Sequence, residues 1–153
     1  MASSGQIVGQ IDGIDELRSK LNGRRADLPI SRFLDRAAFH LQGGARKKVP
    51  VDTGRLKNSI GIESPVIRLR RVGTKVSYGP PVEFGTGPHM PPAGALDGWA
   101  RRKGLDPNAV AERISIRGTK KHPYMQPAAD ETAIEIRTVL VPLLASELES
   151  AYQ

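Results

Sequence analysis

An apolar stripe between residues 27 and 50 is the feature that most constrains how this chain folds. Its members recur three or four residues apart, which places them on one face of a helix; they are Ile30, Phe33, Leu34, Ala37, Ala38, Leu41 and Ala45. Asp27 is a suitable N-cap, Pro29 suits a first helical turn, and Pro50 prevents continuation. The stripe therefore predicts an amphipathic helix, and we interpret Arg46–Lys48 as its cationic C-terminus rather than as a nucleic-acid patch.

The pattern changes to strands after Ile60. Apolar and polar residues alternate over 60–64 and again over 67–72, as expected for half-buried strands. Gly73-Thr74 is a turn signal, and residues 75–78 follow as a returning strand. The segment predicts a hairpin or a three-stranded meander, with Pro65 at an edge or a bend.

The C-terminal residues 128–152 predict a long helix, because apolar side chains recur along one face. Pro142 lies inside this segment and has no backbone N–H to donate, so we expect a kink there. Shorter helices are expected over residues 11–21, between Leu96 and Gly104, and after Asp106-Pro107.

Sixteen glycines and twelve prolines leave much of the remaining chain to loops. Two loops stand out, residues 79–98 and 117–127; the first allows only a turn of helix around residues 82–84. Loops of this length are usually functional or are ordered by a partner. Together these patterns predict an α+β fold in which a small antiparallel sheet packs against the N-terminal amphipathic helix and the long C-terminal helix.

One domain is expected over residues 1–153, because this length suffices for one hydrophobic core. We expect a flexible arm over residues 1–10, a core over 27–128 and the terminal helix over 128–152. The chain contains no cysteine, which excludes disulfides and thiolate metal ligands. No apolar run is long enough to span a membrane, so no membrane partner is expected.

The net charge of +7 is unevenly distributed. Residues 1–121 carry 22 Lys and Arg against 11 Asp and Glu, whereas residues 122–153 carry one Arg against five acids. A basic body with an acidic terminal helix can meet a polyanion or another copy of the same chain.

Catalytic and cofactor-binding patterns are absent from the sequence. His40, His89 and His122 lack the spacing of metal ligands, and there is no nucleophile elbow, phosphate loop or dinucleotide fingerprint. We therefore predict no enzyme, no metal and no cofactor. Asp52 and Glu83 lie in glycine-bearing turns, where they could form an acid–base pair, but capping of a turn or pairing with a base is the stronger interpretation.

Three arginines in the second predicted strand are candidates for sequence-independent contact with duplex DNA. They are Arg68, Arg70 and Arg71, and no aromatic residue lies among them to stack on bases.

Three segments carry a more specific signal. Residues 48–60 read K-V-P-V-D-T-G-R-L-K-N-S-I, residues 82–87 read V-E-F-G-T-G after Tyr78, and residues 118–128 read G-T-K-K-H-P-Y-M-Q-P-A. In this order they resemble the signatures of the small tail-component family of long-tailed double-stranded DNA phages, whose members are neck, head–tail connector or tail-completion proteins. Two features depart from that pattern: Pro80-Pro81 follows the tyrosine, and residues 88–117 form a longer insertion.

The resemblance implies a non-catalytic virion subunit, assembled in the bacterial cytoplasm. It would form a ring, expected to be a hexamer, that joins the head connector to the tail tube or tail terminator and lets DNA pass. The residues to which it assigns structural or assembly roles are Pro50, Val51, Asp52, Thr53, Gly54, Leu56, Ser59, Ile60, Glu83, Phe84, Gly85, Thr86, Gly87, Pro123, Met125 and Pro127. Gly54 and Gly85 are expected to need backbone angles that only glycine adopts easily.

Two other functions compete with this one. The basic body is also compatible with a non-specific duplex-DNA-binding accessory protein of phage packaging. The two turn acids, Asp52 and Glu83, would instead define a small acid–base enzyme.

Overall fold

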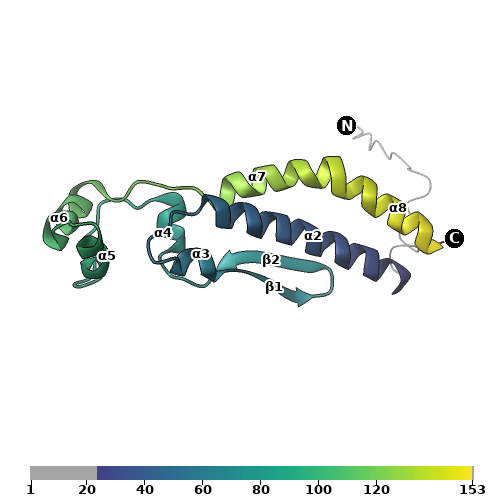
Figure 1. The fold of residues 1–153 in the computed structure, drawn as a ribbon, viewed down its shortest axis with the longest axis horizontal. Coiled ribbons are helices and arrows are strands. Elements are labelled where there is room, and N and C mark those ends of the chain that lie inside the picture. Colours follow the sequence, from purple (N-terminus) through teal and green to yellow (C-terminus); the bar gives the residue numbers. More distant parts are fainter. Residues whose placement is uncertain (1–23, 153) are drawn as a thin grey trace, which may run out of the picture.

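The computed structural model describes residues 24–152, so the predicted arm over 1–10 and the predicted helix over 11–21 lie outside the described part. Helix α2 (Arg24–Lys48) is the centre of the molecule. On one side lies a hairpin of β1 (Ile60–Val66) and β2 (Leu69–Thr74), and on the other lie the C-terminal helices (Figure 1). The predicted α+β class, with a small antiparallel sheet and a long C-terminal helix, is confirmed.

Helix α2 begins earlier than the sequence predicted. It starts at Arg24, so Asp27 lies in the first turn and Pro29 lies inside the helix. Asp27 is not an N-cap because its carboxylate accepts hydrogen bonds from Arg68 on the hairpin. The helix still ends before Pro50, with Arg46, Lys47 and Lys48 in its last turn as predicted.

The hairpin turns at a different place from the one predicted. Ile67 and Arg68 form the turn, Gly73 and Thr74 belong to β2, and residues 75–78 form no strand. Ile60 pairs with Thr74, and the register shifts between Glu63 and Val66, around Pro65. The meander interpretation is wrong, and the sheet has two strands.

The C-terminal helix begins at Met125, three residues before the predicted start. It comprises α7 (Met125–Glu135), the π-helical segment η1 (Ile136–Leu140) and α8 (Val141–Tyr152). The wider π turn directly precedes Pro142, whose nitrogen has no proton to donate. The helix axis changes direction between α7 and α8 (Figure 1), which confirms the predicted kink.

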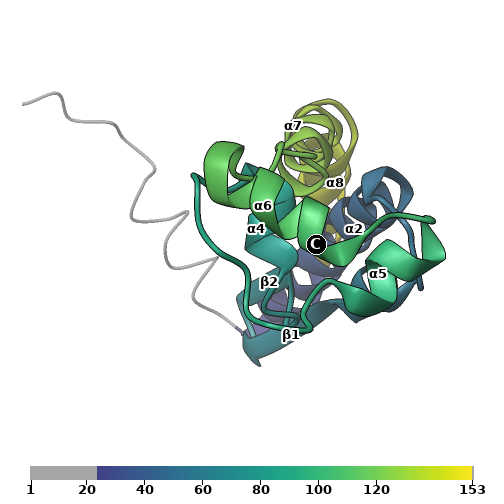
Figure 2. The same ribbon diagram turned by 90° about the vertical axis from the view of Figure 1, so that its left-hand side faces the viewer.

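Shorter helices gather beyond the C-terminal end of α2. They are α3 (Arg55–Ser59), α4 (Gly79–Phe84), α5 (Asp97–Arg102) and α6 (Pro107–Arg117). Asp106 caps α6 by accepting a bond from the Asn108 nitrogen at 3.1 Å. Helices α5 and α6 pack mainly on each other and, with their flanking loops over residues 87–118, form a lobe at one end of the molecule (Figures 1 and 2).

Candidate functional site

The three motif segments meet in one hydrophobic core beside the C-terminal end of α2. This motif junction contains Ala45 from α2, Val49, Leu56 and Ile60 from the first segment, and Tyr124 and Ala128 from the third; Val82 from the second segment packs against it. Ile60 is completely buried, and burying a side chain of this size contributes about 2 kcal/mol. Gly44 allows α7 to approach closely, since an added Cβ would lie 3.1 Å from that of Ala128.

Glu83 connects the second segment to the third. Its side chain is buried, and its carboxylate accepts three backbone N–H bonds at the start of α7, from Tyr124 at 2.7 Å and from Met125 and Gln126 at 2.9 Å. Helix α7 has no side-chain cap at its own N-cap position, Tyr124. Glu83 thus supplies, from 41 residues earlier in the chain, the acceptors that the first N–H groups of a helix require.

The surroundings of Glu83 keep it ionised. Burial opposes the charged form and by itself would raise the pKa of this carboxyl. The three backbone N–H donors outweigh that cost, and the pKa of Glu83 is lowered overall. Burial, together with the negative charge of Glu83, raises the pKa of the Tyr124 hydroxyl. This is a structural carboxylate, and it matches the interpretation of Glu83 as a cap.

A short antiparallel bridge fastens the loop after Glu83 to the third segment. The backbones of Thr86 and Thr119 exchange two hydrogen bonds, and their hydroxyls lie 3.0 Å apart. Gly85 has φ of 73°, and a Cβ there would lie 2.6 Å from the Thr119 oxygen. Gly118 has φ of 68°, and a Cβ there would overlap the Thr86 oxygen. The predicted need for glycine at positions 54 and 85 is confirmed by the positive φ of both.

Asp52 has a different partner from Glu83. Both of its carboxylate oxygens accept bonds from the Arg102 guanidinium in α5, at distances between 2.5 and 3.2 Å. The hydrogen bond from Arg102 lowers the pKa of Asp52. Asp52 does not cap α3: Gly54, with φ of 79°, is the N-cap residue of that helix, and Thr53 Oγ1 accepts a bond from the Arg55 nitrogen at 3.5 Å. The two proposed acid–base residues therefore have separate partners: Asp52 binds Arg102, and Glu83 binds the N-terminus of α7.

The remaining motif residues divide between buried and exposed positions. Ser59 donates to the Leu56 oxygen at 2.7 Å and lies 2.5 Å from the Thr74 hydroxyl, so it supports the start of the hairpin. Val51 and Phe84 are apolar but exposed, at 58% and 76%. The other exposed motif positions are Pro50, Asp52, Thr53, Gly87 and Pro123, whereas Met125 and Pro127 are half-buried.

The arginines of the hairpin do not act as one patch. Arg70 bonds Asp35 at 2.5 Å and Ser31 at 2.7 Å, and only 9% of its side chain is exposed. Arg68 bonds Asp27 at 2.9 Å. The bond from Arg70 lowers the pKa of Asp35. Both guanidiniums therefore attach the hairpin to α2, whereas Arg71 is an exposed residue.

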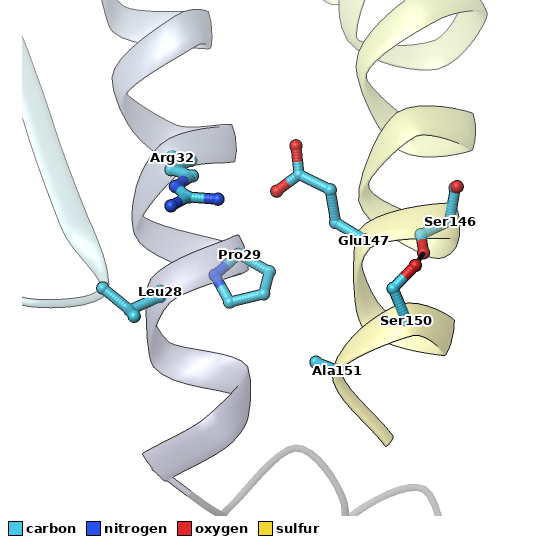
Figure 3. A pocket seen from close by; sticks show the side chains of 7 residues that line it. All are labelled: Leu28, Pro29, Arg32, Ser146, Glu147, Ser150 and Ala151. Carbon is cyan, nitrogen blue, oxygen red and sulfur yellow. Dashed lines mark hydrogen bonds between the residues drawn. The ribbon is translucent and has the colours of Figure 1, made fainter. Parts of the chain in front are cut away.

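A hollow lies between the start of α2 and the end of α8 (Figure 3). Its lining is mixed in character and consists of Leu28, Pro29, Arg32, Ser146, Glu147, Ser150 and Ala151. Glu147 also pairs with Arg36 at 2.9 Å, so its carboxylate joins the two helices. Within residues 24–152 no group of three or more His, Cys, Asp or Glu side chains is arranged to hold a metal ion. No described helix is long and apolar enough to cross a bilayer.

A sequence model of the family described as "Bacteriophage HK97-gp10, putative tail-component" matches residues 14–85. The matched range includes α2, the hairpin, α4, the first motif segment and residues 82–85 of the second. The resemblance to a phage tail-component family is confirmed. It supports a structural role in a phage tail and a place in the virion. A search of curated proteins and a search of solved structures found no match.

Sequence reasoning included Tyr124, Gly118 and Thr119 in the third segment but assigned none of them a role in this junction. Tyr124 is 2% exposed and its hydroxyl lies 3.5 Å from the Gly79 oxygen. One signal was available: the third segment precedes a strong helix yet offers no Ser, Thr, Asp or Asn directly before it. A helix without its own cap requires an acceptor from elsewhere in the chain, and Glu83 provides it.

Proposed function

We propose that this chain is a structural subunit of the neck of a long-tailed phage. Copies assemble in the bacterial cytoplasm into a ring, with six copies expected, between the head connector and the tail tube or tail terminator. Duplex DNA passes through its lumen. The observation that carries the proposal is the match of residues 14–85 to the tail-component family.

The surface of the single chain supports an assembling subunit. Sixteen large apolar side chains are exposed in the described part of the fold, on α2, the hairpin, the α5–α6 lobe and the C-terminal helices among other places. The most exposed of them, each above 60%, are Leu28, Phe39, Phe84, Met90, Ile116 and Ile134. Contacts with neighbouring subunits would remove these side chains from water.

DNA contact within the ring is assigned to Arg71 in preference to Arg68 and Arg70. The latter two bond carboxylates of α2, so turning them toward phosphates would break the attachment of the hairpin. Arg71 is exposed and can reach a passing duplex without that cost. A packaging accessory protein that binds DNA tightly would need more exposed Lys and Arg side chains of this kind on one face.

The enzyme alternative finds no support in the geometry. Asp52 is held by Arg102, and Glu83 is buried against three backbone donors. Asp52→Asn is expected to leave particle assembly intact. Loss of infectivity in particles of normal appearance that carry this variant would favour the enzyme.

Deletion of the gene from a phage that encodes this chain tests the proposal. We expect filled heads and separate tails in electron micrographs of lysates, and joined particles when the native chain is supplied in trans. Normal joined particles without the chain would contradict a neck role.

A further inference from the structure

The lobe formed by α5 and α6 is the part of the described molecule that contributes least to its own core. Helix α6 has no buried residue, although it is 11 residues long. Met90, Leu105 and Ile116 are exposed at 68%, 46% and 65%, and Trp99 at 38%. A projecting element with this much exposed apolar surface is typical of a docking surface.

The same lobe is basic. Together with Lys120 and Lys121 beside it, residues 86–123 carry seven Lys and Arg against three Asp and Glu. Arg102 is paired with Asp52, but Arg113 and Arg117 of α6 are exposed on the same helix as Ile116. The lobe therefore combines apolar anchors with positive charge.

The outer face of the C-terminal helices has the opposite charge. Residues 125–152 carry five acids and one base; Glu131 and Glu147 pair with Lys48 and Arg36 of α2, which leaves Asp130, Glu135 and Glu149 against Arg137. Exposed apolar side chains lie on these helices too, with Ile134 at 63%, Val139 at 47% and Val141 at 48%. Asp130 lies one turn before Ile134, and Glu135 follows it directly.

We propose that the α5–α6 lobe of one copy docks on the α7–α8 face of the next copy. The inference rests on the proposed ring function and names the contact that builds it. The two surfaces complement each other in charge: without Arg102, Glu131 and Glu147, which pair within the chain, the net is +3 over residues 86–123 and −2 over residues 125–152. Within one chain the lobe lies at the end of the molecule (Figure 1) and does not pack on α7 or α8 to any extent, so the complementary surface belongs to another copy. Contact between two different surfaces is heterologous, which is the geometry that closes rings.

Charge reversal tests this contact in the full-length chain. R113E/R117E changes the net charge of α6 from +1 to −3, and D130K/E135K changes the net charge of α7 from −3 to +1. Each variant alone is expected to weaken self-association at least about ten-fold, because like charges then meet. An equimolar mixture restores association, since every lobe then finds a face of opposite charge when the two variants alternate. The matched control K47E/K57E, which reverses two exposed bases outside the lobe, leaves association unchanged.

Sedimentation or native mass spectrometry over a range of concentrations gives the readout, with circular dichroism to establish that each variant is folded. Unchanged association of R113E/R117E, or no rescue in the mixture, would overturn the contact while leaving the ring proposal intact. Loss of duplex-DNA binding by R113E/R117E with association unaltered would assign the lobe to DNA instead. A native chain that remains single at every concentration would contradict both the contact and the ring.

Discussion

Glu83 illustrates how one buried carboxylate can connect two distant parts of a chain. Desolvation makes a buried charge costly unless hydrogen bonds satisfy it. Here the carboxylate is satisfied by three backbone N–H groups at the start of α7, which would otherwise lack acceptors. The charge also lies at the positive end of the helix dipole. The presence of Glu83 in the V-E-F-G-T-G segment is therefore explained by its contribution to folding, without a catalytic role.

Glu83→Gln tests this explanation. The substitution keeps the size but replaces one acceptor oxygen by an NH₂ group that faces backbone donors, so we expect a loss of about 2–3 kcal/mol in the free energy of unfolding. Urea denaturation measures it. Glu112→Gln, at an exposed position of α6, is the control and should change stability by less than about 0.5 kcal/mol. Equal stability of the two variants would refute the cap.

The pH dependence of Glu83 has a defined sign. Its folded pKa is lowered from 4.5, so its stabilising contribution is present above that value and is lost as pH falls through the lower folded pKa. The stability difference between the native chain and Glu83→Gln should therefore shrink below about pH 4.5. A difference that stays constant from neutral pH to about pH 3 would show that the carboxylate charge is not involved.

Substitutions at Gly54 and Gly85 distinguish the cost of backbone strain from the cost of steric overlap. Their φ values are 79° and 73°, but the nearest atom to an added Cβ is 3.6 Å away at Gly54 and 2.6 Å away at Gly85. Gly54→Ala should cost about 1 kcal/mol from strain alone. Gly85→Ala should cost at least about 2 kcal/mol more, because the Thr119 backbone must move. Similar unfolding free energies for the two variants would contradict the close approach of the two loops.

At the scale of elements, the sequence identified the helices better than the hairpin. The stripe between residues 30 and 45 and the Asp106 cap of α6 involve near neighbours and were predicted correctly, whereas Asp27 is not the N-cap of α2. The hairpin turn was placed at Gly73-Thr74 because glycine is a local turn signal. Its true position at Ile67-Arg68 depends on Arg68 and Arg70 reaching Asp27 and Asp35, contacts between residues 35 to 41 positions apart. No local pattern reports such contacts.

Arg70→Lys is the corresponding test of the hairpin. A lysine cannot bond Asp35 and Ser31 with one planar fork, so the hairpin should loosen from α2. Amide hydrogen exchange in β1 and β2 should accelerate, and it should change little in Arg71→Lys, whose side chain lies outside this contact. If the two variants exchange alike, the arginine does not hold the hairpin.

At the scale of the whole molecule, the motif order was enough to suggest the family, and the match over residues 14–85 confirms that resemblance. The sequence could not show that the motif residues form a single junction, because Glu83 and Tyr124 are brought together only by folding. It also could not distinguish the buried members from Val51 and Phe84, which remain exposed. The buried members stabilise the fold, and the exposed Val51 and Phe84 are available for contacts with neighbouring subunits.

Direct imaging of the purified protein by cryo-electron microscopy tests the central claim, that copies of this chain surround a common axis. The account predicts closed rings with an open centre, in which the apolar residues exposed on the single chain are covered by neighbouring copies. Isolated monomers or symmetric pairs without a central channel, at concentrations where phage subunits assemble, would contradict it.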